Sequence, residues 1–85
     1  VLMGTLDEVE LAKWFAETDA AVVMKIGRNL EKIKRALITA SRIEAAFLVK
    51  YAAMPAQKVC RLVDYDSNMA PYFSIIVLHG RGRAP

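Results

Sequence analysis

The chain has 85 residues, of which 55% are hydrophobic and 25% are charged. This composition is typical of one small folded domain and unlike that of a disordered tail. Twelve lysines and arginines against nine aspartates and glutamates give a net charge of +3, which favours anionic partners without identifying one. No window reaches the roughly 18 uninterrupted apolar residues of a membrane span, so we expect a soluble protein without membrane contacts.

The sequence contains no clear catalytic or metal-binding constellation. The single cysteine, Cys60, excludes an internal disulfide and favours a reducing, cytoplasmic setting. As a nucleophile Cys60 would need a nearby base, but the only histidine, His79, lies far along the chain. Paired cysteines or histidines at ligand spacing are absent, and so are the glycine-rich phosphate loops of nucleotide-binding enzymes. We therefore predict no catalytic side chain and no metal site.

Two helices and the strand between them are expected in the first half of the chain. Thr5 and Glu8 form the T-x-x-E pattern of a capping box, and apolar residues at helical spacing predict a first helix over residues 6–17. The run 21–26 has the length and β-branched content of a buried strand that is covered on both faces. Apolar residues recur at helical intervals over residues 29–40, which indicates a second amphipathic helix.

Three further strands are expected in the second half. Residues 47–52, 58–63 and 72–78 are rich in β-branched, aromatic or alternating apolar residues. With a short strand at the start, the predicted order is β-α-β-α-β-β-β. The early strands suit parallel pairing and the later ones antiparallel hairpins, so we predict an α/β fold with one mixed sheet. Residues 1–80 would form the domain and residues 81–85 a basic tail.

Three places are not fully explained by packing. Lys25 interrupts an apolar run and leads into Gly27 and Arg28 at the carboxyl end of a strand, where open α/β sheets bind ligands. A lysine that simply reaches solvent is the alternative. Residues 52–55 place small side chains and a proline in strand-like sequence, which favours a β-bulge; the alternative is a place where a flat ligand approaches the backbone. Residues 71–74 open the last strand with two aromatics, a pattern typical of core packing.

These places also carry a family resemblance. The runs VVMKIGRNLEKIKRAL, YAAMPAQ and APYFSIIVL, in this order and spacing, resemble the C-terminal half of the tetrapyrrole methylases. The match extends from Gly4 to Gly80. It implies the C-terminal domain of a two-domain, homodimeric enzyme that transfers a methyl group from S-adenosylmethionine to a ring carbon of an acidic tetrapyrrole. The family's N-terminal domain and its G-x-G-P-G-D loop are not in this chain, so the resemblance implies that the chain alone is inactive.

The resemblance also implies which residues form the binding sites. Lys25 and Arg28 would attract the carboxylates of the tetrapyrrole. Ala53 stands where many relatives have threonine, so a hydroxyl contact would be lost. Methyl transfer from a sulfonium depends on alignment and not on a nucleophilic side chain, in agreement with the residues present. The cofactor would contact Met24, Lys25, Ile26, Ala52, Ala53, Pro71 and Tyr72.

Two alternatives stay open. The first keeps the methylase fold but assigns another position on the macrocycle, or another tetrapyrrole pathway. The second takes the basic charge as the footprint of a small nucleic-acid-binding module. The lysines and arginines of the second expected helix are interspersed with apolar core positions and no aromatic platform accompanies them, which disfavours nucleic acid.

Overall fold

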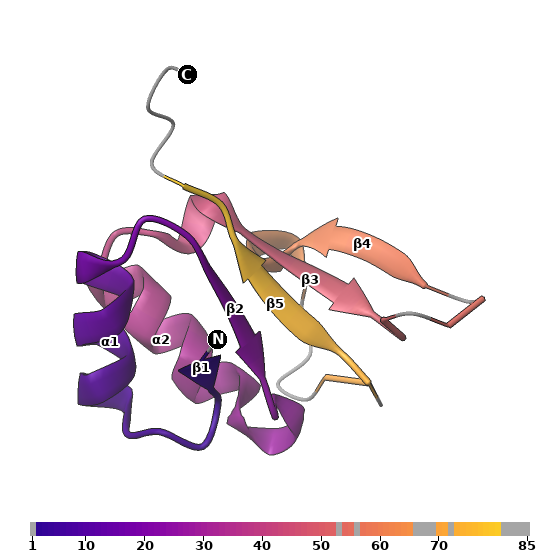
Figure 1. Ribbon diagram of the computed structural model, residues 1–85, viewed down its shortest axis with the longest axis horizontal. Coiled ribbons are helices and arrows are strands. Elements are labelled where there is room, and N and C mark those ends of the chain that lie inside the picture. Colours follow the sequence, from indigo (N-terminus) through magenta and orange to yellow (C-terminus); the bar gives the residue numbers. More distant parts are fainter. Residues whose placement is uncertain (1, 53, 56, 66–69, 72, 81–85) are drawn as a thin grey trace.

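A five-stranded mixed sheet with two helices dominates the computed structural model, which describes residues 2–52, 54–55, 57–65, 70–71 and 73–80 (Figure 1). The α/β class with a mixed sheet is confirmed. Short 3-10 turns connect the elements: η1 (Gly27–Asn29), η2 (Ile43–Ala45) and η3 (Leu62–Asp64). The main elements are β1 (Leu2–Met3), α1 (Glu8–Glu17), β2 (Ala21–Met24), α2 (Leu30–Thr39), β3 (Ala46–Lys50), β4 (Lys58–Arg61) and β5 (Ile75–Leu78).

The strands lie in the order β1-β2-β5-β3-β4 across the sheet. The first pair is parallel, with Leu2 opposite Val23. The last strand in the chain, β5, inserts between β2 and β3 and is antiparallel to both, so that Val77 lies opposite Val22 on one side and Phe47 on the other. The antiparallel β3–β4 hairpin completes the sheet. Parallel pairing of the early strands and antiparallel pairing of the later ones were both predicted from the sequence.

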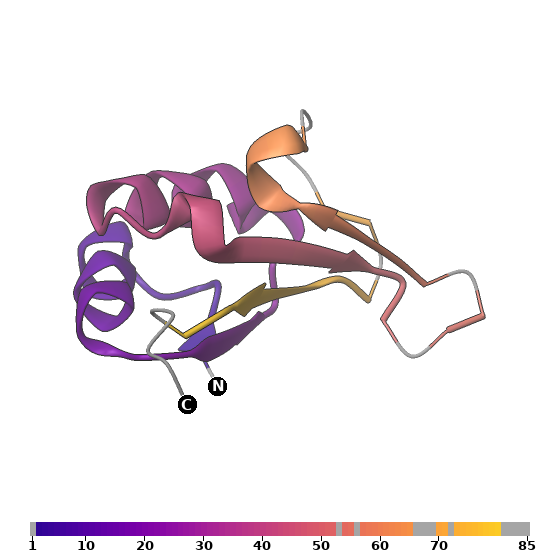
Figure 2. The same ribbon diagram turned by 90° about the horizontal axis from the view of Figure 1, so that it is seen from above.

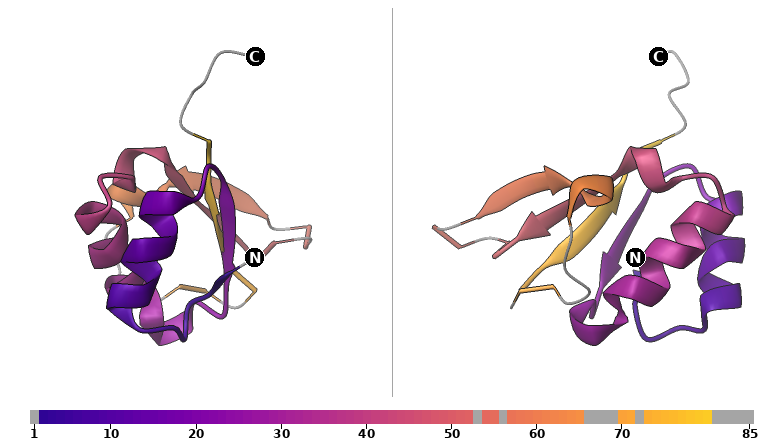
Figure 3. Two further views of the ribbon diagram at one scale, coloured as in Figure 1. Left: turned by 60° about the vertical axis from the view of Figure 1, so that its left-hand side comes forward. Right: turned by 180° about the vertical axis from the view of Figure 1, so that it is seen from behind.

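Helices α1 and α2 pack against the same face of the sheet (Figures 2 and 3). The connections β1-α1-β2 and β2-α2-β3 both advance in the same direction across the sheet, and right-handed crossovers in one direction place their helices on one side. Cys60 is half-buried and packs against the core between the helices and the sheet. That core consists of Leu11, Phe15, Val23, Ile26, Leu30, Ile33, Ala36, Leu37, Ala46, Leu48, Leu62, Ile76 and Leu78.

The other face of the sheet is apolar and has no covering layer in the described ranges. Alternation along the strands places Val22, Phe47 and Val77 side by side on this face. In β2, Val23 faces the helices and is 0% exposed, whereas Met24 faces outward and is 42% exposed. The expectation that residues 21–26 are covered on both faces is therefore wrong for this chain, because both crossovers put their helices on the same side.

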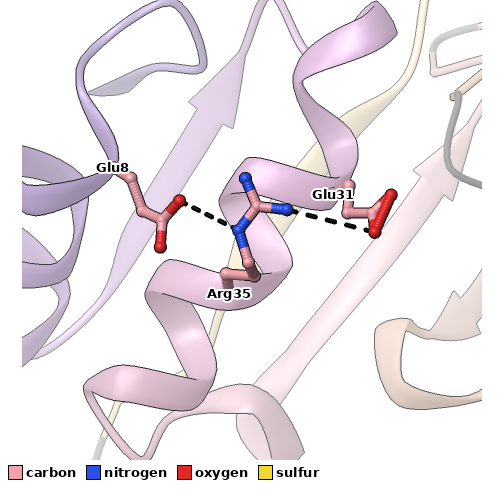
Figure 4. Close-up of polar contacts among 3 residues, drawn as sticks. All are labelled: Glu8, Glu31 and Arg35. Atoms are coloured by element: carbon pink, nitrogen blue, oxygen red, sulfur yellow. Dashed lines mark hydrogen bonds and ion pairs between the residues drawn. The ribbon is translucent and has the colours of Figure 1, made fainter.

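The predicted capping box is also absent. Helix α1 begins at Glu8 with Asp7 at the N-cap position, and no side chain caps it. The Glu8 carboxylate instead accepts a hydrogen bond from Nε of Arg35 in α2 at 2.9 Å, and Arg35 also pairs with Glu31 at 3.9 Å (Figure 4). These pairs are exposed, so they contribute only about 0–1 kcal/mol each. Thr5 precedes the N-cap residue Asp7 and does not cap the helix.

Gly4 allows a close backbone approach between the end of β1 and the end of β2. A Cβ at Gly4 would lie 2.7 Å from the carbonyl oxygen of Lys25 and 2.9 Å from Cδ1 of Ile33. We expect Gly4→Ala to lower the free energy of unfolding by about 1–3 kcal/mol in urea denaturation, since a backbone atom must move. Gly80→Ala is the control, because its nearest neighbour is the rotatable carboxylate of Asp19 at 3.1 Å. Equal losses in the two variants would rule out the close approach as the cause.

Neither helix in the described ranges has the length and apolar character that a membrane crossing requires.

Candidate functional site

A pocket of about 950 Å³ lies where β2 ends, β3 leaves the sheet and β5 begins. In Figure 1 the end of β2 lies at the bottom centre, and the end of β3 and the start of β5 lie to its right. The volume is in the range of cavities that hold small molecules and cofactors. The pocket combines segments that are far apart in the sequence, so it exists only in the folded chain.

Five of the residues predicted to bind the cofactor line this pocket. Met24, Lys25 and Ile26 form one wall, Ala52 a second and Pro71 a third. The predicted convergence of these three segments is therefore present in the fold. Contact with a cofactor remains a prediction from the resemblance.

Three other predicted residues are not placed in the pocket. Ala53 and Tyr72 lie outside the described residues. Arg28 is exposed on η1 and does not line the cavity. The sequence interpretation also missed several lining residues, which are Thr5, Gly27, Asn29, Ala70, Phe73, Ser74 and Ile75.

Some of the missed residues lay within segments that had been noticed for other reasons. Thr5 was assigned to a capping box and instead lines the cavity. Phe73 belongs to the run that was expected to be core, yet its side chain is 57% exposed at the pocket. An aromatic residue next to a proline gives no sequence signal that separates a core position from a pocket wall, because both environments are apolar.

The pocket rim contains unusual backbone conformations. Lys25, Tyr51 and Phe73 have φ angles of 59°, 53° and 57°, in the left-handed region. Each such non-glycine residue costs on the order of 1 kcal/mol, and strain of this kind gathers at ligand-binding sites. The conformations also explain why β2 ends at Met24 and β3 at Lys50, each earlier than predicted, since a left-handed residue cannot continue a strand.

Backbone hydrogen bonds hold the rim segments together. The amide of Ala52 donates to the carbonyl of Phe73 at 2.7 Å, which joins the exit of β3 to the segment before β5. The amide of Ala70 donates to the carbonyl of Gly27 at 3.2 Å and joins the same segment to η1. The side-chain amide of Asn29 donates to the carbonyl of Lys25 at 3.3 Å. Two of these three bonds join backbone groups only, so they fix the walls without using side chains that a ligand would displace.

The wall chemistry suits a flat, largely apolar ligand with an anionic group. Met24, Ile26 and Ile75 supply apolar surface, and Lys25 is the single charged residue among the described lining residues. No histidine or cysteine lies among them. The described residues hold no group of three or more His, Cys, Asp or Glu arranged around a metal. The hydroxyl groups of the lining, on Thr5 and Ser74, have no histidine or carboxylate among the described lining residues to activate them, and the Ser74 hydroxyl donates to the carbonyl of Pro71 at 2.7 Å.

Comparison with known proteins reveals close relatives. The chain is 42% identical over 80 residues to precorrin-2 C(20)-methyltransferase from a Sinorhizobium species, a match that covers 94% of this chain and 33% of that protein. It is 40% identical over 83 residues to the cobalamin biosynthesis protein CobIJ of Mycobacterium bovis, covering 98% and 16%. The chain belongs to the tetrapyrrole methylase family. The family resemblance of its three sequence runs is thereby confirmed.

A third methylase relative is more distant. Cobalt-precorrin-2 C(20)-methyltransferase of Salmonella typhimurium is 30% identical over 81 residues, covering 93% of this chain and 34% of that protein. This tetrapyrrole methylase chain therefore spans about a third or less of the length of these relatives. No family profile matches the chain. No solved structure matches it either.

Proposed function

We propose that this chain is the C-terminal domain of an S-adenosylmethionine-dependent methyltransferase that methylates precorrin-2 at C-20 in cobalamin biosynthesis. The observation that carries the proposal is the 42% identity over 80 residues to a precorrin-2 C(20)-methyltransferase. Residues 1–80 would form the domain and residues 81–85 its basic tail. An N-terminal domain would occupy part of the remaining length of such an enzyme. We expect the enzyme to be a cytoplasmic homodimer that needs no metal.

The pocket is proposed as this domain's half of the cofactor site. S-adenosylmethionine supplies an activated methyl group on a cationic sulfur. The apolar walls at Met24 and Ile26 would pack against the adenosine, and small Ala52 would let it approach the backbone. Lys25, at the pocket, and Arg28, on the neighbouring turn, would attract the carboxylates of the tetrapyrrole. Ala53 and Tyr72 remain candidates for further cofactor contacts.

The proposed reaction requires no nucleophilic side chain in the pocket. Methyl transfer from a sulfonium to carbon is an in-line displacement, and the ring carbon of the substrate supplies the electron pair. The protein has to hold the two reacting carbons in contact and aligned, which is worth up to about 7–11 kcal/mol of the barrier. A rim fixed by backbone hydrogen bonds is suited to this task, because alignment depends on walls that do not shift.

The test is methyl transfer by a two-domain polypeptide that carries this chain. We expect it to move an isotopically labelled methyl group from S-adenosylmethionine to precorrin-2, with the label at C-20 by NMR of the product. A label at another ring position would establish the alternative of a different tetrapyrrole methylase. A folded protein that binds S-adenosylhomocysteine but transfers no methyl group to any tetrapyrrole would contradict the proposed activity.

A further inference from the structure

Two lysines lie beside the ring of Tyr65, and a third is paired with one of them on the neighbouring strand; none of the three lines the pocket. Nζ of Lys34 in α2 lies 5.8 Å from the centroid of the Tyr65 ring, and Nζ of Lys50 at the end of β3 lies 5.5 Å from it. Lys58 lies directly opposite Lys50 in the β3–β4 ladder. Side chains at directly paired positions point to the same face of a sheet, so Lys50 and Lys58 share one face of the hairpin.

This group of lysines is not explained by fold stability. Like charges directly opposite each other in a sheet are destabilising. The ion pairs in the described part of the chain involve Arg35 and Arg61 and none of these lysines. Arg61, on the same strand as Lys58, does pair with a carboxylate, that of Glu44 at 3.1 Å. The lysines therefore concentrate positive charge that no described carboxylate neutralises.

The ring of Tyr65 positions the ammonium groups of Lys34 and Lys50. An aromatic face attracts an ammonium group through its quadrupole without cancelling the charge. Nζ of Lys34 also donates a hydrogen bond to the backbone carbonyl of Tyr65. The ammonium groups of Lys34 and Lys50 are thus held near one ring and keep their capacity to bind an anion.

Two of the lysines lie close in the sequence to residues that line the pocket. Lys50 is two residues before Ala52, and Lys34 is five residues after Asn29. At roughly 1.5 Å per helical residue and 3.3 Å per extended residue, Lys34 lies about 7.5 Å along the chain from Asn29, and Lys50 lies about 7 Å from Ala52. A ligand larger than the cofactor that extends beyond these two walls would come near both lysines.

We propose that Lys34 and Lys50, beside Tyr65, and Lys58, opposite Lys50, bind peripheral carboxylates of the tetrapyrrole substrate. This inference rests on the proposed function, because acetate and propionate groups of the macrocycle are the anions it assigns. Several ammonium groups on neighbouring elements match a ligand with several carboxylates on one rim. Charge-assisted hydrogen bonds to those groups would orient the macrocycle over the pocket.

The test uses Lys50→Gln/Lys58→Gln in a two-domain polypeptide that carries this chain. We expect the KM for the tetrapyrrole to rise about 10- to 100-fold, as expected for the loss of one or two charge-assisted contacts, while the Kd for S-adenosylhomocysteine stays unchanged. The matched control, Lys13→Gln/Lys32→Gln, removes the same charge from α1 and α2 and should leave the KM near the wild-type value. Added salt should raise the KM of the wild type more than that of the Lys50/Lys58 variant.

Binding of uroporphyrin, a tetrapyrrole polycarboxylate, gives a second measurement that does not depend on catalysis. Wild type and control should bind it. The double variant Lys50→Gln/Lys58→Gln should bind it at least about 10-fold more weakly, and so should the single variant Lys58→Gln, whose side chain is exposed. Equal KM and equal uroporphyrin affinity in the two double variants would overturn this site and leave the proposed function standing. If the lysine variants bind uroporphyrin more weakly but the wild type transfers no methyl group, the proposed function is overturned and the proposed anion site stands.

Discussion

Replacement of Arg42 by methionine is expected to lower the free energy of unfolding by about 3–5 kcal/mol, comparable to the loss of one partner of a buried charged network. Arg42 is only 6% exposed, and its guanidinium donates four hydrogen bonds to backbone carbonyls. Nη1 donates to Phe15 and Thr18, both at 2.8 Å, and Nη2 donates to Asp19 at 2.6 Å and His79 at 2.9 Å.

The four acceptors explain the size of the effect. They belong to the end of α1, the loop that enters β2 and the residue after β5, so one side chain joins three segments. Carbonyl groups at a helix end have no partner within the helix, and a cation there also interacts favourably with the helix dipole. Methionine fills similar space but leaves these carbonyls without a donor.

Urea denaturation of the chain measures this prediction. A domain of this size has a total stability of about 4–13 kcal/mol, so Arg42→Met should lose a large share of it and unfold at a much lower urea concentration than the wild type. Arg42→Lys should be intermediate, because one ammonium cannot reach all four carbonyls in the geometry of the planar guanidinium. Arg28→Met, at an exposed position, should change stability by less than about 0.5 kcal/mol. If Arg42→Met and Arg28→Met have the same effect, the guanidinium does not hold these segments together.

Ala52→Trp is expected to weaken binding of S-adenosylhomocysteine by about 100-fold or more in a two-domain polypeptide that carries this chain. Ala52 lines the pocket and is half-buried. An indole at this position would occupy space that the proposed cofactor needs, and a ligand without room loses both its contacts and its orientation. The hydrogen bond from Ala52 to the carbonyl of Phe73 uses the backbone amide, so the substitution can retain it.

Isothermal titration calorimetry and urea denaturation together test the Ala52 prediction. The affinity should fall while the midpoint of unfolding changes little, because a residue at a pocket rim is not enclosed by the core. The same substitution at Ala20, an exposed residue before β2, should leave both quantities near the wild-type values. Unchanged affinity in Ala52→Trp would show that the cofactor does not occupy this pocket.

Helix α2 shows what could be predicted from local sequence. Its expected range, 29–40, differs from the observed Leu30–Thr39 by one residue at each end. Ile33 and Leu37 lie on one buried stripe, because a helix repeats every 3.6 residues and its pattern needs no information from elsewhere in the chain. The convergence of Met24, Ala52 and Pro71 at one pocket was predicted differently, from the family resemblance together with the order of the strands.

The ends of β2 and β3 and the start of β5 could not be predicted. Lys25, Tyr51 and Phe73 take left-handed conformations that lysine and the aromatics seldom adopt by themselves. Hydrogen bonds between distant segments, such as that from Ala52 to Phe73, stabilise the rim in this shape. The missed pocket residues also depend on contacts between segments that are far apart in the chain, and local sequence does not reveal such contacts.

By itself, the sequence determined the α/β class, the alternation of helices and strands and the family, because these follow from periodicities and residue runs that are local. Only the tertiary structure decided that β5 lies between β2 and β3, that both helices lie on one face, and that Arg42 binds four carbonyls. It also decided that Lys34 and Lys50 share the ring of Tyr65. Each of these depends on contacts between residues far apart in the chain, and such contacts form only when the whole core closes.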